Sequence, residues 1–186
     1  MSTMPIASPM TAAEYLANAD ETRRTELVEG VVVVNEPRRL HQHLLFEIAV
    51  ALRAWTSAKR GRGEVSMPLD VAIDERNVYA PDVLWYAEGR IPHLRADRPY
   101  PVPDLAVEIR SPTTWRHDIG AKKAGYERAG LAELWLIDSA ADVVFAFRRS
   151  RPGVATFDSA RDRARRDAGV SAPARFRARA RRTVRK

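Results

Sequence analysis

A chain of 186 residues without cysteine is long enough for one domain-sized core, and it excludes disulfide scaffolds, thiolate metal sites and cysteine nucleophiles. The net charge of +7 arises at the C-terminal end: residues 1–148 hold 18 of the 31 Lys and Arg but 21 of the 24 Asp and Glu, a balance of −3. No apolar run of about 18 residues and no signal-peptide pattern is present, so we expect a cytoplasmic protein without a membrane segment.

The first part of the chain predicts a short helix, two strand pieces and a longer helix. The short helix begins at Ser8 or Thr11, and Glu14 stands in the capping-box position relative to Thr11. Residues 25–37 are rich in valine and end in proline, and their glycine indicates a turn or bulge between two strand pieces. Residues 38–63 then place apolar side chains at helical spacing before a Gly/Arg turn.

The second part predicts more strands and one further helix. Apolar runs predict strands at residues 67–73, 78–87, 104–111, 133–138 and 142–147. The first two form a hairpin through DERN, and the third is almost continuously apolar, which indicates burial on both faces. Residues 116–130 predict a helix that ends at Gly130. This order predicts an α/β fold, a mixed β-sheet flanked by α-helices, with the 104–111 strand at its centre.

The arginine-rich end of the chain predicts a tail rather than a second domain. Residues 149–186 hold 13 basic and 3 acidic residues and few large apolar ones, so we expect them to be largely disordered, with nascent helix around residues 158–168. Such a tail is either a solvated extension or a set of phosphate contacts without sequence specificity. The predicted organisation is therefore one domain over residues 1–148, followed by this tail.

Two acidic residues stand beside apolar strand residues. Asp82 lies where the VLWY run begins, and Glu108 lies inside VEI. A buried carboxylate is unfavourable unless it is paired, protonated or bound to a metal. Carboxylates from adjacent strands can share a divalent cation, and Mg²⁺ or Mn²⁺ prefers such oxygen ligands.

A lysine on the following helix completes the candidate chemistry. Lys122 is four residues from Asp118 and from Tyr126, so the three share one helix face. An ammonium near a bound cation can polarise an attacking water or stabilise charge on a phosphate. Together with the two carboxylates, this pattern predicts metal-assisted phosphodiester hydrolysis.

The same segments resemble a known family. APDVLWY (residues 80–86) and PDLAVEIRSPTTWRHDIGAKKAGYERAGLAELWLID (residues 103–138) are similar to the signature of the Uma-type "putative restriction endonuclease" family, a bacterial branch of the PD-(D/E)XK nuclease superfamily. The likeness covers roughly residues 10–148. It implies a restriction-endonuclease-like fold and a Mg²⁺- or Mn²⁺-dependent endonuclease that acts on DNA, and it leaves other nucleic acids and a homodimer open.

The resemblance also assigns roles to residues. Asp82 matches the PD element and Glu108 the acidic residue of (D/E)XK, which implies that both are metal ligands. Arg110 stands where the superfamily usually has lysine, and Lys122 matches the lysine that this family takes from the next helix. Glu26 matches the acidic residue of an ELVDGE-like segment, as an extra ligand or a water-orienting group. Two departures are Lys123, directly beside Lys122, and the lack of apolar strands after Phe147.

Several residues also have simpler interpretations. Asp118 is expected as a helix N-cap or first-turn acid, and Tyr126 as a packing residue. His41 and His43 point to different helix faces, which argues against zinc. Arg110 is expected to contact phosphate or a neighbouring acid. The alternative function is a catalytically inactive nuclease-fold protein that binds nucleic acid or acts as a scaffold, which the atypical C-terminal end favours.

Overall fold

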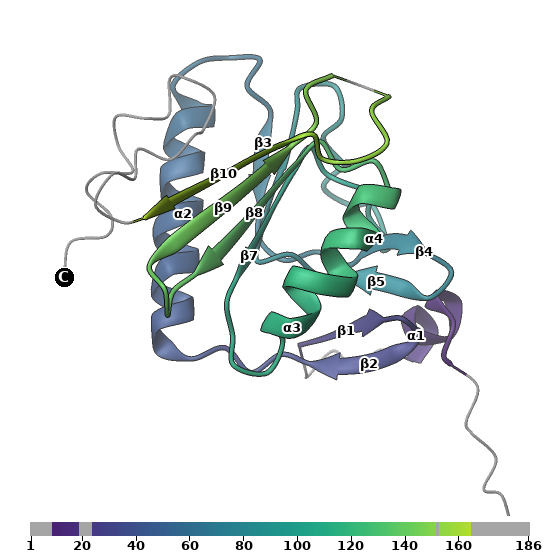
Figure 1. The fold of residues 1–186 in the computed structure, drawn as a ribbon. Helices are drawn as coiled ribbons and strands as arrows, with labels where there is room; N and C mark the ends of the chain where they lie inside the picture. The colour runs from purple at the N-terminus through teal and green to yellow at the C-terminus, as the bar shows by residue number, and fades with distance from the viewer. Residues whose placement is uncertain (1–8, 19–23, 152, 165–186) are drawn as a thin grey trace, which may run out of the picture.

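The computed structural model describes residues 9–18, 24–151 and 153–164 (Figure 1). Within these ranges the strands form a four-stranded sheet, β2-β1-β5-β4, and a six-stranded sheet, β10-β9-β8-β7-β6-β3. The strands are β1 (Thr25–Val28), β2 (Val31–Val34), β3 (Glu64–Ser66), β4 (Val71–Asp74), β5 (Asn77–Tyr79), β6 (Val83–Tyr86), β7 (Leu105–Ile109), β8 (Glu133–Asp138), β9 (Val143–Arg148) and β10 (Ser159–Ala164). The helical segments are α1 (Ala12–Asn18), α2 (Arg39–Ser57), α3 (Trp115–His117), the π-helical η1 (Asp118–Lys122) and α4 (Lys123–Arg128). The α/β class is as predicted, but the strands divide between two sheets.

Strand β7 lies inside the six-stranded sheet, as its apolar sequence predicts. It pairs with β6 in the antiparallel and with β8 in the parallel direction, so the sheet is mixed. All its residues are buried. A strand with neighbours on both sides and covered faces needs apolar residues throughout, and this makes the acidic Glu108 within it exceptional.

The two faces of β7 contact different helices. Leu45 and Leu52 of α2 pack in one cluster with Val107, whereas Ala106 packs in another cluster with Tyr126 of α4. Figure 1 shows α2 on one side of the sheet and the α3–α4 segment on the other. Because side chains alternate along a strand, Glu108 faces the same side as Ala106. The fold therefore places the Glu108 carboxylate beneath the helix that carries Lys122.

The run over residues 78–87 is two strands and not one. Strand β5 belongs to the smaller sheet and β6 to the larger, and the chain crosses between the sheets at Pro81 and Asp82. Proline has no N–H to donate to a strand ladder, which explains the break. Asp82 consequently stands at the junction of the two sheets.

The six-stranded sheet continues beyond residue 148. Strand β10 pairs antiparallel with β9 from Ser159 to Ala164, where nascent helix was predicted. That prediction is wrong for these residues, because an edge strand is held by main-chain hydrogen bonds and does not require an apolar sequence. The lack of apolar strand sequence after Phe147 therefore does not leave the sheet without this edge strand. The remainder of the predicted tail, residues 165–186, lies outside the described residues.

Two local predictions in the N-terminal part are confirmed. Thr11 N donates to Glu14 Oε2 at 2.8 Å and Glu14 N donates to Thr11 Oγ1 at 3.2 Å, which is the capping box at the start of α1. The β1–β2 hairpin turns at Glu29 and Gly30, both with positive φ, at 52° and 78°. This turn fixes the register that places Glu26 opposite Val33.

The predicted helix over residues 116–130 contains an irregularity that its sequence does not reveal. Residues 118–122 form a π-helical turn between α3 and α4. Gly130 follows α4 with a φ of 82°, so the predicted helix end is confirmed. Short π-helical segments are frequent at functional sites, and this one contains both Asp118 and Lys122.

Gly125→Ala is expected to destabilise the fold by about 1–3 kcal/mol, because close packing leaves no room for a methyl group. A Cβ at this position would lie 2.4 Å from the hydroxyl oxygen of Tyr79, which is fully buried. The matched change Gly120→Ala meets no atom within 4 Å and should leave stability unchanged or raise it by up to about 1 kcal/mol. Urea unfolding compares the two variants, and equal midpoints would contradict this packing argument.

Candidate active site

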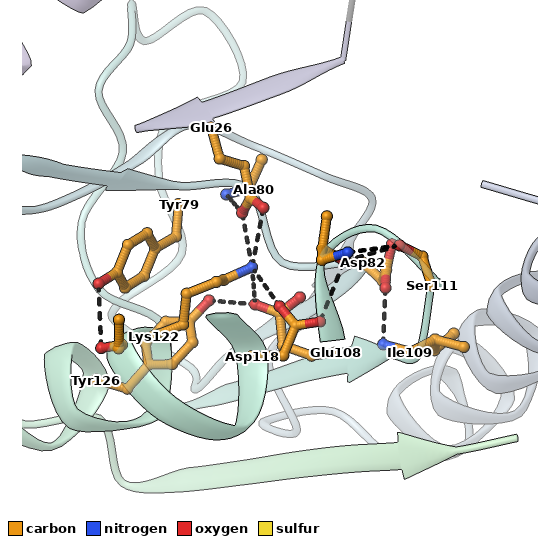
Figure 2. A network of polar contacts seen from close by, with 12 residues as sticks. Glu26, Tyr79, Ala80, Asp82, Glu108, Ile109, Ser111, Asp118, Lys122 and Tyr126 are labelled. Carbon is orange, nitrogen blue, oxygen red and sulfur yellow. Dashed lines mark hydrogen bonds and ion pairs between the residues drawn. The ribbon is translucent and has the colours of Figure 1, made fainter. Parts of the chain in front are cut away.

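A buried lysine is the centre of the candidate site. Lys122 is 1% exposed, and its Nζ donates to Glu26 Oε1 at 2.8 Å and Oε2 at 3.0 Å. The same nitrogen lies 2.8 Å from Glu108 Oε1 and 3.2 Å from Asp118 Oδ1 (Figure 2). Strands β1 and β7 and the π-helical turn thus bring three carboxylates around one ammonium. Three of the four predicted site residues, Glu26, Glu108 and Lys122, are in direct contact.

The fourth predicted residue, Asp82, lies beside this cluster with its own partners. Its Oδ2 accepts hydrogen bonds from the main-chain N of Ile109 at 2.8 Å and from His41 Nε2 at 3.0 Å. Its Oδ1 accepts from Arg24 at 3.0 Å. Ile109 follows Glu108 in the chain, so the hydrogen bond at Ile109 ties Asp82 to the strand that carries Glu108.

The cluster holds more negative than positive charge in a buried place. Burial raises the pKa of Glu108 well above its ordinary value, and the negative charges of Asp118, Glu26 and Asp82 add to this against the opposing ammonium of Lys122. Burial also raises the pKa of Asp118. For Lys122, burial acts to lower the pKa, but the three carboxylates outweigh it and raise the pKa well above that of free lysine. The ammonium therefore stays charged, and any proton taken up goes to a carboxylate.

Tyr126 and Asp118 belong to the site more closely than their sequence positions suggest. The buried Tyr126 hydroxyl donates to Glu108 Oε1 at 2.6 Å, so it does more than pack. Asp118 lies in the first turn of η1, as predicted, but it is 2% exposed and accepts from Thr114 Oγ1 at 3.2 Å. The spacing of four residues that joins Asp118, Lys122 and Tyr126 was the available signal for this shared face.

The two basic residues that complicated the lysine assignment lie outside the cluster. Arg110 NH1 pairs with both carboxylate oxygens of Asp138 on β8, at 2.8 and 3.0 Å. Lys123 pairs with Glu127 at 3.4 Å and is partly exposed. Lys122 is thus the lysine that the fold directs toward Glu108.

Sequence reasoning missed two residues of the site. Arg24 and His41 both contact Asp82, from the start of β1 and from α2. His41 is buried, whereas His43 is exposed, which agrees with the prediction that the two point to different helix faces. Nothing in the local sequence joins residues 24, 41 and 82, because their proximity arises from tertiary packing, which includes that of α2 against β6 and β7.

Comparison with known proteins gives the family. The family model described as "Putative restriction endonuclease", Uma2, matches residues 12–166. The chain belongs to the Uma2 family. A search of curated proteins found no match. The match to Uma2 extends through β10, so this strand is part of the family domain.

A solved structure shows the same fold. It is described as a "putative nuclease belonging to DUF820" from Anabaena variabilis ATCC 29413 and superposes with a TM-score of 0.72 at 20% sequence identity, over 90% of this chain and 91% of the other. The restriction-endonuclease-like α/β fold is therefore confirmed for this Uma2 chain. No helix in the described ranges combines the length and the apolar character needed to cross a membrane.

The donor chemistry of the site fits the divalent cation that the nuclease fold implies. Asp118 Oδ1 is buried, and its partner in the described part of the chain is the Lys122 ammonium at 3.2 Å, an ion pair without a hydrogen bond. The contacts of Glu108 with Tyr126 and Lys122 are both made by its Oε1. Within the same ranges no three His, Asp or Glu side chains form a metal-ligand group, and Glu26, Glu108 and Asp118 are paired with Lys122. Mg²⁺ commonly binds one or two carboxylates and keeps several waters. Asp82 and Glu108 are two such carboxylates, and the hydrogen bond from Ile109 N to Asp82 ties them to neighbouring positions.

Proposed function

We propose that this protein is a divalent-cation-dependent endonuclease that hydrolyses phosphodiester bonds of DNA. The observation that carries the proposal is the buried cluster in which Glu26, Glu108 and Asp118 share a single ammonium, since proteins rarely bury such an excess of charge without a use for it. Membership of the Uma2 family supports the reaction class.

Each residue has a stated part in this proposal. Asp82 and Glu108 would hold Mg²⁺ or Mn²⁺, which when bound supplies Lewis acidity and a water of lowered pKa. The Lys122 ammonium fixes the position of Glu108. Its three N–H donors are used by carboxylates, so it would donate to a phosphate oxygen or the attacking water only in exchange for one of these contacts. Glu26 orients Lys122 through two hydrogen bonds and is itself held by the N–H of Ala80 at 2.7 Å.

DNA cleavage with and without Mg²⁺ or Mn²⁺ tests the proposal. We expect the wild-type protein to cut plasmid DNA only with the cation, and Asp82→Asn to lose about 100-fold or more of the rate, as removal of a charge-stabilising group commonly does. Glu127→Gln is the matched control, because this acid of α4 pairs with Lys123 outside the cluster. Wild-type and Asp82→Asn proteins that cleave equally well would contradict the proposal. Matched RNA substrates and a solution mass address the two questions that the sequence leaves open, the choice between DNA and other nucleic acids and homodimerisation.

One observation favours a second candidate, a nuclease-fold protein that binds nucleic acid without cutting it. In the described part of the chain the carboxylates already have cationic or hydrogen-bonding partners and form no three-ligand group. Calorimetry separates the two candidates. Failure to bind Mg²⁺ or Mn²⁺ even with DNA present, together with salt-sensitive DNA affinity, would support the binding protein.

A further inference from the structure

The three partners of Asp82 differ in whether they can leave it. The Ile109 partner is a main-chain N–H within β7, and His41 is buried at 3% exposure. Neither group can move away from Asp82 without disturbing the core. The Arg24 side chain is 26% exposed. Arg24 is therefore the partner of Asp82 that can move into solvent without disturbing the core.

The two oxygens of Asp82 also differ in what they can still accept. Oδ2 already accepts two hydrogen bonds, from His41 and Ile109, which uses both of its lone pairs. Oδ1 accepts one, from Arg24. A cation reaches Asp82 through Oδ1, which is the oxygen that the Arg24 guanidinium contacts. Arg24 and an incoming cation therefore compete for the same atom.

The position of Arg24 keeps it beside the site after it leaves Asp82. Arg24 directly precedes β1 and is two residues from Glu26, so both side chains project from the same face of the extended chain. Its main-chain oxygen accepts from Asn35 N at 2.9 Å, which anchors the backbone while the side chain moves. A guanidinium is always charged and binds phosphate oxygens in pairs.

We propose that Arg24 is a placeholder cation: it neutralises Asp82 in the metal-free protein, yields Oδ1 to the divalent cation, and then contacts a phosphate of the nucleic acid. This inference rests on the proposed function, because it requires a cation at Asp82. It assigns a substrate contact to a residue that lies outside the acid–lysine cluster.

Calorimetric titration of the metal-free protein with Mn²⁺ tests the first half. We expect Arg24→Gln to bind Mn²⁺ about fivefold more tightly than wild type. This factor corresponds to the free energy of one partly exposed ion pair, which the cation no longer has to displace from Asp82. Arg24→Lys, which keeps a cation there, should remain close to wild type. The matched control is Arg90→Gln, because Arg90 also pairs with an aspartate, Asp104, next to the opposite end of β7.

Salt dependence of DNA binding tests the second half. With Ca²⁺ in place of Mn²⁺ to slow hydrolysis, Arg24→Gln should lower the slope of log affinity against log salt by about 0.9, the value of one phosphate contact. Arg90→Gln should leave the slope unchanged. An unchanged slope in Arg24→Gln would overturn the phosphate contact.

The outcomes separate this inference from the proposed function. If the wild-type protein takes up no Mn²⁺, both fail together. If it binds Mn²⁺ and Arg24→Gln binds equally or more weakly, Arg24 is a structural partner of Asp82 and only the inference fails.

Discussion

Lys122→Met is expected to cost about 3–5 kcal/mol of the free energy of unfolding, the usual penalty when one partner of a buried ion pair is removed. The ammonium of Lys122 is bonded to Glu26 and lies within 3.2 Å of both Glu108 and Asp118. Methionine has a similar volume but leaves these carboxylates to face one another in a buried place. Urea unfolding followed by circular dichroism measures the loss.

The loss in Lys122→Met should depend on pH in a defined direction. Burial already raises the pKa of Glu108 and of Asp118, and without the ammonium both are protonated still more readily in the folded than in the unfolded protein, so stability falls as pH rises above their ordinary pKa values. We therefore expect a smaller loss at pH 5 than at pH 8. Lys123→Met is the matched control and should lose less than about 1 kcal/mol, because its ion pair with Glu127 is partly exposed. Equal losses in the two variants would contradict the central role of Lys122.

Glu108→Gln is expected to stabilise the metal-free protein at neutral pH, because it removes a charge that burial disfavours and leaves Lys122 with Glu26 and Asp118 as anionic partners. Burial raises the pKa of Glu108 above the value it has in the unfolded chain. The folded protein thus binds this proton more tightly, and stability is lost as pH rises from about 4.5 through the raised pKa. Glutamine does not titrate, so the variant does not lose stability in this way, and its side-chain oxygen can still accept from Tyr126 and Lys122. The stability difference between Glu108→Gln and wild type should therefore grow as pH rises from about 4.5 through the raised pKa of Glu108.

Glu26→Gln is the control for that result, and its expected effect has the opposite sign. Both carboxylate oxygens of Glu26 accept from Lys122, and Oε1 also accepts from the Ala80 N–H. In Glu26→Gln the NH2 group of the amide would face the Lys122 ammonium or the Ala80 N–H, both of which are hydrogen-bond donors. A hydrogen bond at that position could not form, and its loss costs about 1–3 kcal/mol. Thermal unfolding across pH compares the two variants. A destabilised Glu108→Gln would show that Glu108 serves the fold rather than the site.

Sequence patterns were sufficient for most of the strands and helices, and the resemblance to the Uma-type family pointed to the lysine at the centre of the buried cluster. The apolar run around Glu108, the Gly130 helix end and the spacing from Asp118 to Tyr126 are local signals, and each corresponds to an observed strand, helix end or shared face. Local periodicity predicts which residues of an element are buried, and an acid at a predicted buried position indicates a candidate site.

The missed features depend on contacts between segments far apart in the chain. Arg24 and His41 meet Asp82 across 58 and 41 residues. The π-helical turn and the pairing of β10 likewise follow from packing and main-chain hydrogen bonds, which have no local sequence signature. Pro81 lies inside the run that was predicted as one strand, and its missing N–H is a local signal for a break, but no local signal shows that the two parts join different sheets.

The central claim is that Asp82 and Glu108 hold a divalent cation, and a calorimetric titration with Mn²⁺ tests it most directly. It should be performed on the wild-type protein, Asp82→Asn and Glu108→Gln. Because Glu108→Gln is expected to be at least as stable as wild type, lost binding in this variant cannot be attributed to unfolding. The account predicts that wild type takes up Mn²⁺ and that both variants bind it at least about tenfold more weakly, as expected for loss of a direct ligand. Undiminished Mn²⁺ binding by Glu108→Gln would contradict it.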